Sequence, residues 1–367
     1  INIVFDNVEL ADFSVDEYKE GILAFQEQYA IPYGIMGIFD AYATDNAIEA
    51  YRQLAHEELL KIRVRTAWLA DPSKDDTQFD KMITEKGRYD VGEEFRITTV
   101  KFFCDAGAFG FYMNEPFEKD ILERNGLPED YRGSSQWSDE RLRKVFLELS
   151  EAGFQIHVHC MGDAAVKQIL DAFEYVDNRG VKGNRNAIAH ITNIDEHDMK
   201  RMAELNVIAS MQPAWPIYDW FAENFEIPLV GRERVLNQYP MGRLKKMGVT
   251  IASGTDFPVM TILNPFIGIQ IGATRKNPET SPGYEMYKDL VCGPEGMETQ
   301  DCMSLNDMIE SYTISGAYEM FAENITGSIE CGKSADLLVL DRNLGESDVM
   351  KIEYSKINFR IYKGKRI

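Results

Sequence analysis

The chain has 367 residues, 44% of them apolar and 27% charged, a globular composition that excludes disordered, collagen-like and coiled-coil proteins. Sixty acidic against thirty-nine basic residues give a net charge of -21, which repels phosphate backbones and anionic lipid. No apolar run approaches the roughly 20 residues that span a bilayer. We therefore expect neither nucleic acid nor membrane as a partner. At roughly 150 residues per domain, the length predicts two or three domains, or one barrel with an accessory piece.

The cysteines are odd in number and widely scattered, with no CxxC pair. They are Cys104, Cys160, Cys292, Cys302 and Cys331. This usage argues against a disulfide framework or a structural zinc knuckle and predicts a cytoplasmic protein. Because the chain begins with Ile1 rather than Met, a location reached after cleavage of a secretion signal stays open as an alternative.

From about residue 34, short apolar runs alternate with amphipathic stretches, the pattern of βα units on a parallel sheet. In the clearest unit, Ser138 should cap a helix that Gly153 ends, a strand follows, and Asp163 should cap the next helix. The expected strands cover residues 35–40, 62–69, 98–104, 154–160, 187–191, 207–211 and 249–254. No GxGxxG or GxxxxGK[ST] motif follows the early strands, which disfavours Rossmann and P-loop folds.

These seven strands predict an α/β fold, a TIM-like (β/α)8 barrel whose first strand is missing, over residues 1–322. The tail, residues 323–367, differs in kind, because two strand-like stretches at 327–342 and 357–367 flank a turn-rich, charged segment. So few strands cannot bury a core alone. We expect the tail to complete a small sheet formed with another part of the protein.

Chemistry in a TIM barrel lies at the C-terminal ends of the strands. His159 and His190 end neighbouring strands and Asp256 ends the last one, so they offer the nitrogen and oxygen donors of catalytic zinc, manganese or iron sites. A single histidine at a strand end is more often a packed residue than a metal ligand. Two histidines on neighbouring strands together with an aspartate on the last strand favour a metal site. His157 lies on the same strand face one layer deeper, where a packed role is about as frequent as a functional one.

Lys101 lies inside an apolar strand, and two interpretations of it stay open. The commoner is that its amine pairs with a carboxylate, for which Asp105 could serve. The other is that burial depresses its pKa, so that the neutral amine takes up carbon dioxide and becomes a carbamate able to bridge two metals. The sequence by itself favours the first.

Asp256 lies two residues after Gly254 and directly before a Phe-Pro pair, a setting for a carboxylate that passes a proton from an attacking water to a leaving group. The alternative is an Asx turn that caps the next segment. Residues 211–221, which include Trp215, could wall a substrate pocket or, more commonly, cover the barrel mouth. His56 and His197 are expected on the surface.

The motifs together resemble the metal-dependent amidohydrolase superfamily, in its amidohydrolase-3 or YtcJ-like branch, in order over nearly the whole chain. The segments that carry the resemblance are Val100-Lys101-Phe102-Phe103, His159-Cys-Met-Gly-Asp163, Ala189-His190, Gly254-Thr-Asp-Phe-Pro258 and residues 327–341. Each motif is weak alone, whereas their order and spacing are specific.

The resemblance implies a (β/α)8 barrel, a small β-sandwich of which residues 323–367 are the C-terminal part, and one or two divalent metals, with zinc preferred. It implies Lys101 as a carboxylated bridging lysine, His159 and His190 as metal ligands, and Asp256 as the acid/base that also contacts metal. We assign the substrate contacts to His157, Asp163, Trp215 and Phe257.

The implied activity is hydrolysis of a non-peptide C–N bond in a small molecule, such as an amide, N-formyl amine or cyclic amide, and a homodimer is expected. The sequence departs from the family in having no His-x-His pair before Lys101 and Ala189 before His190. We therefore expect the chain to be a C-terminal part of a longer protein. Two alternatives stay open, a non-catalytic ligand-binding barrel without metal and a metal-dependent ester or lactone hydrolase.

Overall fold

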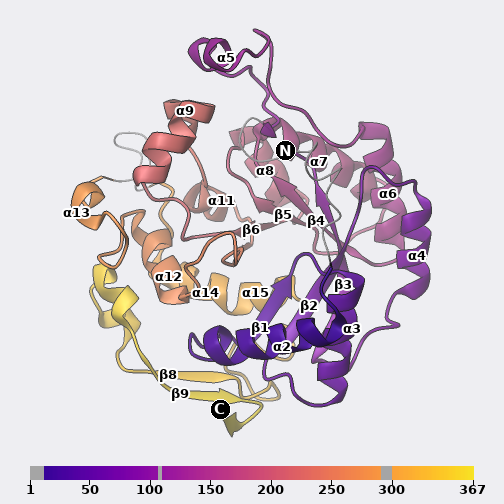
Figure 1. Cartoon of the computed structure of the whole chain (residues 1–367), viewed down its shortest axis with the longest axis vertical. Coiled ribbons are helices and arrows are strands. Elements are labelled where there is room, and N and C mark those ends of the chain that lie inside the picture. Colours follow the sequence, from indigo (N-terminus) through magenta and orange to yellow (C-terminus); the bar gives the residue numbers. More distant parts are fainter. Residues whose placement is uncertain (1–11, 106–109, 291–299) are drawn as a thin grey trace.

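A curled, wholly parallel sheet forms the centre of the molecule (Figure 1). The structure is a computed structural model that describes residues 12–105, 110–290 and 300–367. The sheet runs in chain order through β1 (Gly37–Asp40), β2 (Arg63–Leu69), β3 (Phe95–Phe103), β4 (Gln155–Cys160), β5 (Ala187–His190), β6 (Ile208–Met211) and β7 (Ile251–Ser253). All seven predicted strands are confirmed, with shifts of a few residues at their ends. Together with the helices they form a TIM-like barrel architecture.

Helices connect and cover the strands. The α-helices are α2 (Val15–Phe25), α3 (Asp45–His56), α4 (Thr77–Glu85), α5 (Lys119–Asn125), α6 (Asp139–Glu151), α7 (Asp163–Asp177), α8 (Glu196–Glu204), α9 (Ile227–Val230), α10 (Arg232–Leu236), α11 (Met241–Lys246), α12 (Pro265–Thr274), α13 (Tyr284–Tyr287), α14 (Leu305–Tyr312) and α15 (Ile314–Glu319). The π- and 3-10 segments are η1 (Gln26–Ala30), η3 (Ala222–Glu226), η4 (Leu344–Glu346) and η5 (Val349–Tyr354). Within the described residues, no helix has the length and apolar character needed to cross a membrane.

Helix α6 begins and ends as predicted, because the Ser138 hydroxyl accepts from the Arg141 backbone N–H and Gly153 has a φ of +76°. The prediction for the next helix was wrong by one residue, since Gly162 is the N-cap of α7 and Asp163 is its first residue. A Cβ atom at Gly162 would lie 2.0 Å from the Tyr112 carbonyl oxygen. The close approach of these two backbones therefore requires glycine at the cap.

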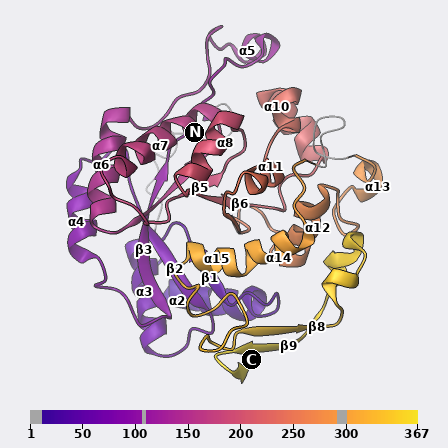
Figure 2. The ribbon, with the colours of Figure 1, turned by 180° about the vertical axis from the view of Figure 1, so that it is seen from behind.

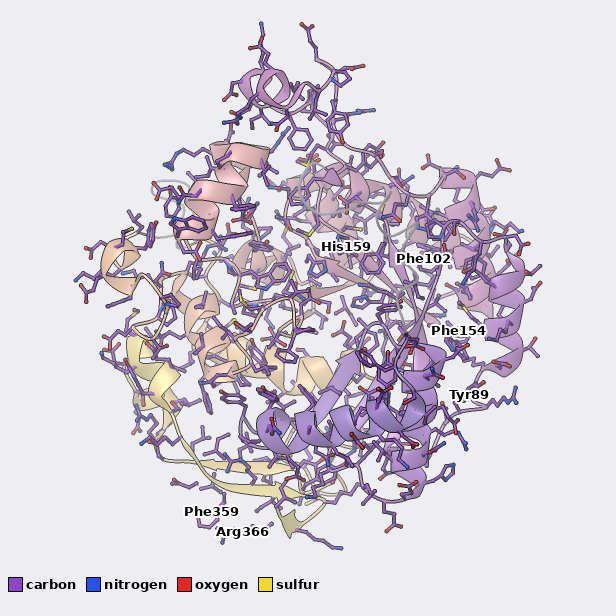
Figure 3. The ribbon with its side chains drawn as sticks, viewed as in Figure 1. Tyr89, Phe102, Phe154, His159, Phe359 and Arg366 are labelled. Carbon is purple, nitrogen blue, oxygen red and sulfur yellow. The ribbon has the colours of Figure 1, made fainter. Side chains whose placement is uncertain are left out.

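Alternation along the strands separates an apolar outer face from a polar inner face. On β3, Phe102 points outward and packs against Phe79 of α4 and Phe146 of α6, with ring centroids 6.0 and 5.0 Å apart. In Figure 3, Phe102 lies toward these helices, whereas His159 lies near the middle of the molecule. The neighbouring Lys101 therefore points into the curl of the sheet.

The register of β3 and β4 aligns the inner residues of the two strands. Lys101 is opposite His157, and Phe103 is opposite His159. The inner face of β5 carries the small residues Ala187 and Ala189, and this leaves room for the larger side chains of β4.

The tail forms a separate antiparallel sheet in the order β10 (Lys365–Arg366), β9 (Ile357–Tyr362), β8 (Leu337–Leu340). Both stretches predicted as strand-like therefore contain strands. Figures 1 and 2 show α14 and α15 between this sheet and the parallel sheet. A buried ion pair between Arg63 of β2 and Asp336 also ties the tail to the barrel. The boundary at residues 322 and 323 stays a prediction.

The last carbonyls of α15 and the residue after it are held by side chains from the lower part of the barrel. Arg185 Nη1 donates to the Tyr318 carbonyl at 2.8 Å, and Gln155 Nε2 donates to the Glu319 carbonyl at 3.1 Å. Arg65 Nε, fully buried, donates to the Met320 carbonyl at 3.0 Å. These donors satisfy carbonyls that a helix C-terminus leaves unpaired. They form a polar clamp that closes the floor of the barrel, and we call Arg65, Gln155 and Arg185 the floor clamp.

Removing one member of the floor clamp should destabilise the protein. Arg65→Ala removes the buried, charged donor to the Met320 carbonyl and should lower the free energy of unfolding by about 2 to 3 kcal/mol, as measured by urea denaturation. The control is Arg88→Ala, whose side chain is 66% exposed and pairs with Glu85, and which should cost about 1 kcal/mol or less. Equal effects would contradict this account of the floor.

Candidate functional site

Four nitrogen-bearing side chains meet inside the curled sheet. Lys101 comes from β3, His157 and His159 from β4, and His190 from the end of β5. Lys101, His157 and His190 are each 5% exposed or less. Their strands are consecutive in a parallel sheet, so their C-terminal ends meet at one edge, as expected for a barrel site.

Lys101 is hydrogen-bonded to a histidine. Its Nζ lies 3.0 Å from Nδ1 of His157, and both groups are buried. The predicted pairing of Lys101 with Asp105 is wrong, because Asp105 is used by the backbone: its carboxylate accepts from the N–H groups of Tyr112, Met161 and Gly162. Asp105 therefore fixes the loops after β3 and β4, close to the site.

His159 and His190 lie edge to face, with ring centroids 4.6 Å apart. Nδ1 of His190 is 2.7 Å from Oε1 of Gln212, at the end of β6. A carbonyl oxygen can only accept, so Nδ1 carries the hydrogen and the lone pair of His190 is on Nε2. Among the described residues, the buried Nε2 atom of His159 has no hydrogen-bond partner, and it lies 3.8 Å from Oδ1 of Asp105. Each ring thus keeps one nitrogen free for a ligand.

The backbone of β5 departs at His190 from the regular inward and outward alternation of strand side chains. Ala187 and Ala189 face inward, so a regular strand would direct His190 outward. Instead, His190 and Ile191 have left-handed φ values of 73° and 47°, which are unfavourable for residues with a Cβ atom. Such strain concentrates at functional sites. Here it accompanies the placement of the imidazole beside His159.

Trp215 covers His190 on the other side. Its ring is stacked on the imidazole, with centroids 5.2 Å apart and planes 3° from parallel. Within the described chain, its indole N–H is buried without an acceptor. Trp215 therefore lies where a substrate contact was predicted, with a donor to offer.

Burial sets the charge of the inner groups. Desolvation lowers the pKa of His190 to about 3 and holds the pKa values of His157 and His159 well below their usual range, with help from neighbouring positive charge. Desolvation also lowers the pKa of Lys101 to about 8, although the charge of Asp256 opposes it. The imidazoles are therefore neutral near pH 7, the state in which they bind metal.

Asp256 follows β7 in the left-handed region, at a φ of 56°. Burial raises the pKa of its carboxyl group, and the charge of Lys101 acts in the opposite direction. In the part of the chain that the structure describes, no group donates a hydrogen bond to this carboxylate. Only its backbone carbonyl serves the following turn, accepting from Val259 N–H at 2.8 Å. The Asp256 side chain therefore does not form the Asx turn that the sequence left open as its alternative role.

The remaining predicted contacts lie farther from the histidines. Phe257 packs on Phe25 and Tyr29 of the N-terminal helical segment, with ring centroids 5.9 and 5.7 Å away. Asp163 accepts from the Asn114 backbone N–H and lines a separate cavity of about 350 Å³ together with Asn193 and Arg234. The structure therefore does not bring Phe257 and Asp163 into contact with His159 and His190.

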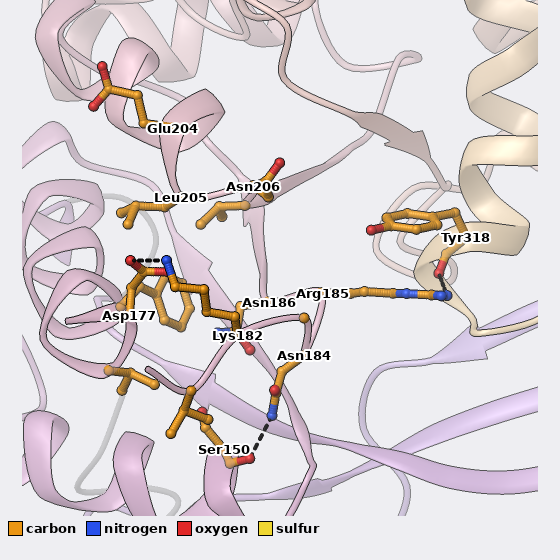
Figure 4. Close-up of a pocket in the computed structure, with 15 residues that line it drawn as sticks. Ser150, Asp177, Lys182, Asn184, Arg185, Asn186, Glu204, Leu205, Asn206 and Tyr318 are labelled. Atoms are coloured by element: carbon orange, nitrogen blue, oxygen red, sulfur yellow. Dashed lines mark hydrogen bonds and ion pairs between the residues drawn. The ribbon is translucent and has the colours of Figure 1, made fainter. Parts of the chain in front are cut away.

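A second cavity, of about 210 Å³, opens at the opposite ends of β5 and β6 (Figure 4). Its polar groups already pair with one another: Asn184 donates to the Ser150 carbonyl, Lys182 pairs with Asp177, and Arg185 belongs to the floor clamp. The catalytic candidates do not line it.

The side chains of the site supply some, but not all, of the ligands that a metal ion needs. Two imidazoles present Nε2 atoms, and the Gln212 carbonyl behind His190 is the kind of partner that orients ligating histidines. Among the described residues, no three histidine, cysteine or carboxylate side chains converge closely enough to hold an ion. A closed ligand set would also need Lys101 or Asp256, and Asp256 does not form such a group with the two histidines.

One group near the site was missed from the sequence. Glu319, on α15, points into the barrel from below, and its Oε1 lies 3.8 Å from Nε2 of His157. Burial raises the pKa of Glu319 to about 7, and the nearby Ser210 and Lys101 oppose that shift. No local signal marks it, because a glutamate near a helix end usually faces solvent.

Comparison with known proteins assigns the chain to a family. The model of the amidohydrolase family named Amidohydro_3 matches residues 2–367. The chain therefore belongs to this family, within its YtcJ-like branch.

Two curated relatives and one solved structure illustrate the match. Bacillus subtilis YtcJ, assigned to the amidohydrolases, is 24% identical over 72% of this chain and 46% of its own length. The N-substituted formamide deformylase of Arthrobacter pascens is 22% identical over 84% of this chain and 53% of its length. A metal-dependent hydrolase from Pyrococcus horikoshii OT3 matches with a TM-score of 0.70 and 24% identity, over 92% of this chain and 62% of that one. The chain thus spans about half the length of these curated relatives.

The buried neutral histidines predict an acid-dependent loss of stability. Unfolding restores the ordinary pKa of 6.5 to His190, so below pH 6.5 and above the folded value of about 3 the unfolded state binds the additional proton. The free energy of unfolding of metal-free protein should fall as the pH falls, with a contribution approaching about 1.4 kcal/mol per pH unit from His190.

Denaturation between about pH 5 and pH 7 measures this slope. His190→Asn should reduce it by the share of one histidine, whereas His197→Asn, at a side chain that is 82% exposed, should leave it unchanged. Equal slopes in wild-type protein and His190→Asn would show that His190 is not buried as a neutral ring.

Proposed function

We propose that this chain forms the barrel of a metal-dependent hydrolase that cleaves non-peptide C–N bonds in small molecules, such as amides, N-formyl amines or cyclic amides. Membership of the amidohydrolase family supports this proposal, as does the likeness to a formamide deformylase. The observation that carries it is the pair His159 and His190, neutral and edge to face, each with an Nε2 atom that makes no hydrogen bond.

His159 and His190 would hold the metal through Nε2, with Asp256 and a carboxylated Lys101 as oxygen ligands. Nitrogen and oxygen donors of this kind suit zinc. Carboxylation requires a neutral amine, and burial gives Lys101 a pKa of about 8 that makes the neutral form accessible. Its nitrogen would attack the carbon of carbon dioxide, a C–O π pair would move to oxygen, and one N–H proton would leave to water.

The bound metal would supply positive charge that polarises the scissile carbonyl and acidifies the attacking water. Asp256 would take the proton from this water as its oxygen bonds to the carbonyl carbon. The same proton would pass to the leaving nitrogen as the C–N bond breaks, so the carboxylate is regenerated. Burial raises the pKa of Asp256, which makes its carboxylate a stronger base for this proton transfer.

Four side chains remain proposed substrate contacts. Trp215 has the strongest support, because its unpartnered indole N–H lies beside His190. His157 would act from below through its bond to Lys101. Asp163 and Phe257 line more distant surfaces, where they could contact only a larger substrate.

Two variants separate ligand from acid/base. His159→Asn should reduce the zinc bound per chain. Asp256→Asn keeps one side-chain oxygen for the metal, so it should retain more zinc than His159→Asn while slowing hydrolysis of N-formyl, N-acyl and cyclic amide substrates by about 10²- to 10⁴-fold. Elemental analysis after purification without chelator and a substrate panel that includes lactones measure both. Asp120→Asn, at an exposed position, is the control.

Absence of metal from the wild-type protein after reconstitution would contradict the hydrolase proposal for this chain and favour the non-catalytic barrel. Turnover of lactones without turnover of amides would instead favour the ester and lactone hydrolase.

A further inference from the structure

The cavity that Asp163 lines, of about 350 Å³, is bordered by none of the four nitrogen-bearing side chains of the candidate site. Asp163 and Asn193 enter it from the segments after β4 and β5, Asp195 from the start of α8, and Arg234 from α10. Ligand pockets in proteins begin at roughly 300 Å³. This cavity, which we call the Arg234 cavity, is therefore large enough for a small molecule.

Asn193 brings an unpaired acceptor to the Arg234 cavity. The residue is 8% exposed, and its Nδ2 donates to the Arg234 carbonyl at 3.1 Å, which fixes the orientation of the side-chain amide. Its backbone N–H donates to the Met161 carbonyl at 2.9 Å, so the residue is held from both sides. Among the described residues, its buried Oδ1 atom has no hydrogen-bond partner. A donor on a bound molecule would remove the cost of this unpaired acceptor.

Arg234 brings an unpaired donor to the same cavity. Its Nη2 donates to the carbonyls of Glu115 and Pro116 at 2.9 and 2.8 Å, and its guanidinium lies 5.1 Å from the centroid of the Phe117 ring. In the part of the chain that the structure describes, the buried Nη1 atom has no acceptor. The guanidinium is therefore fixed through one nitrogen and keeps a second for a ligand. A carboxylate is among the acceptors that it binds most strongly.

Two carboxylates, those of Asp163 and Asp195, lie close together at this cavity. Asn114 binds both, because its backbone N–H donates to Oδ1 of Asp163 at 2.8 Å and its Nδ2 donates to Oδ2 of Asp195 at 2.9 Å. Asp195 is the N-cap of α8, yet its side chain makes no capping hydrogen bond. Burial raises the pKa of Asp195, and the charge of Asp163 adds to that shift. Two neighbouring negative charges favour a positively charged ligand beside them.

The lining of the cavity favours an organic molecule over a metal ion. Within the described ranges, no three histidine, cysteine or carboxylate side chains converge closely enough to hold an ion. Arg243, which also lines the cavity, is already bound by Asp301 through hydrogen bonds of 2.7 and 2.9 Å. Arg234 is therefore the better placed of the two to receive an anion. Met113 and Ile194 supply an apolar wall.

We propose that the Arg234 cavity is a binding site for a small α-amino acid. The ammonium group binds the two carboxylates and donates to Oδ1 of Asn193, and the carboxylate of the amino acid accepts from Nη1 of Arg234. An aliphatic side chain contacts the apolar wall. One molecule thereby supplies the missing partners of both unpaired atoms. Because His159 and His190 do not line the cavity, this site does not depend on the proposed function.

Isothermal titration calorimetry with three matched probes tests the roles of the two charged groups. L-Leucine carries both groups, 3-methylbutylamine lacks the carboxylate, and 4-methylpentanoate lacks the ammonium. We expect about one molecule of L-leucine to bind per chain. Each of the other two probes should bind at least about tenfold more weakly, because it loses a charge-assisted hydrogen bond.

Three variants locate the binding site. Asp195→Asn removes the charge, retains the shape of the side chain and can still accept from Asn114, and it should weaken L-leucine binding at least about tenfold. Asp139→Asn, at an exposed position in the first turn of α6, is the matched control and should bind like the wild type. His159→Asn should also bind L-leucine like the wild type, which separates this site from a metal centre that an amino acid could chelate.

Three results would overturn the proposal. No binding of L-leucine at concentrations of several millimolar would mean that the cavity holds only water. Equal affinity for L-leucine and for either one-group probe would mean that the cavity does not recognise both charged groups. Loss of binding in His159→Asn together with its retention in Asp195→Asn would place the amino acid at the histidine cluster.

Discussion

Exclusion of water from the inner face of the curled sheet is the constraint on which the site depends. It removes hydration from one amine and three imidazoles, and this keeps the rings neutral and lowers the pKa of Lys101 to about 8. Neutral imidazoles bind metal, and a neutral amine can react with carbon dioxide. The same burial makes each polar atom without a partner unfavourable for stability. Polar groups therefore lie beside the buried rings, Gln212 next to His190 and Glu319 next to His157.

The floor clamp connects the architecture to this site. Arg65, Gln155 and Arg185 come from separate segments of the chain, yet all three bind backbone carbonyls at the end of α15. They close the lower end of the curl and hold Glu319 under His157. The segment that leads into the tail therefore contributes to the site, as well as to packing.

Features that depend on local periodicity were predicted well from the sequence. The alternation of short apolar runs with amphipathic stretches identified all seven strands, and the period of two along a strand put His157 and His159 on one face. Features whose position depends on contacts between distant segments were not predicted. The left-handed turn at His190, the capture of Asp105 by backbone N–H groups and the entry of Glu319 from α15 each depend on segments that are distant in the chain. The one-residue error at Asp163 arose because the contact between Gly162 and Tyr112 is not visible in local sequence.

The most direct test of the account is a crystal structure of the protein grown with zinc, with anomalous diffraction measured at the zinc edge. The account predicts an anomalous peak inside the curl of the sheet, about 2.0 to 2.1 Å from Nε2 of both His159 and His190, with Nδ1 of His190 still bonded to Gln212. A peak bound only by surface carboxylates, or rings that present Nδ1 to the ion, would contradict the claim that these two histidines form the metal centre.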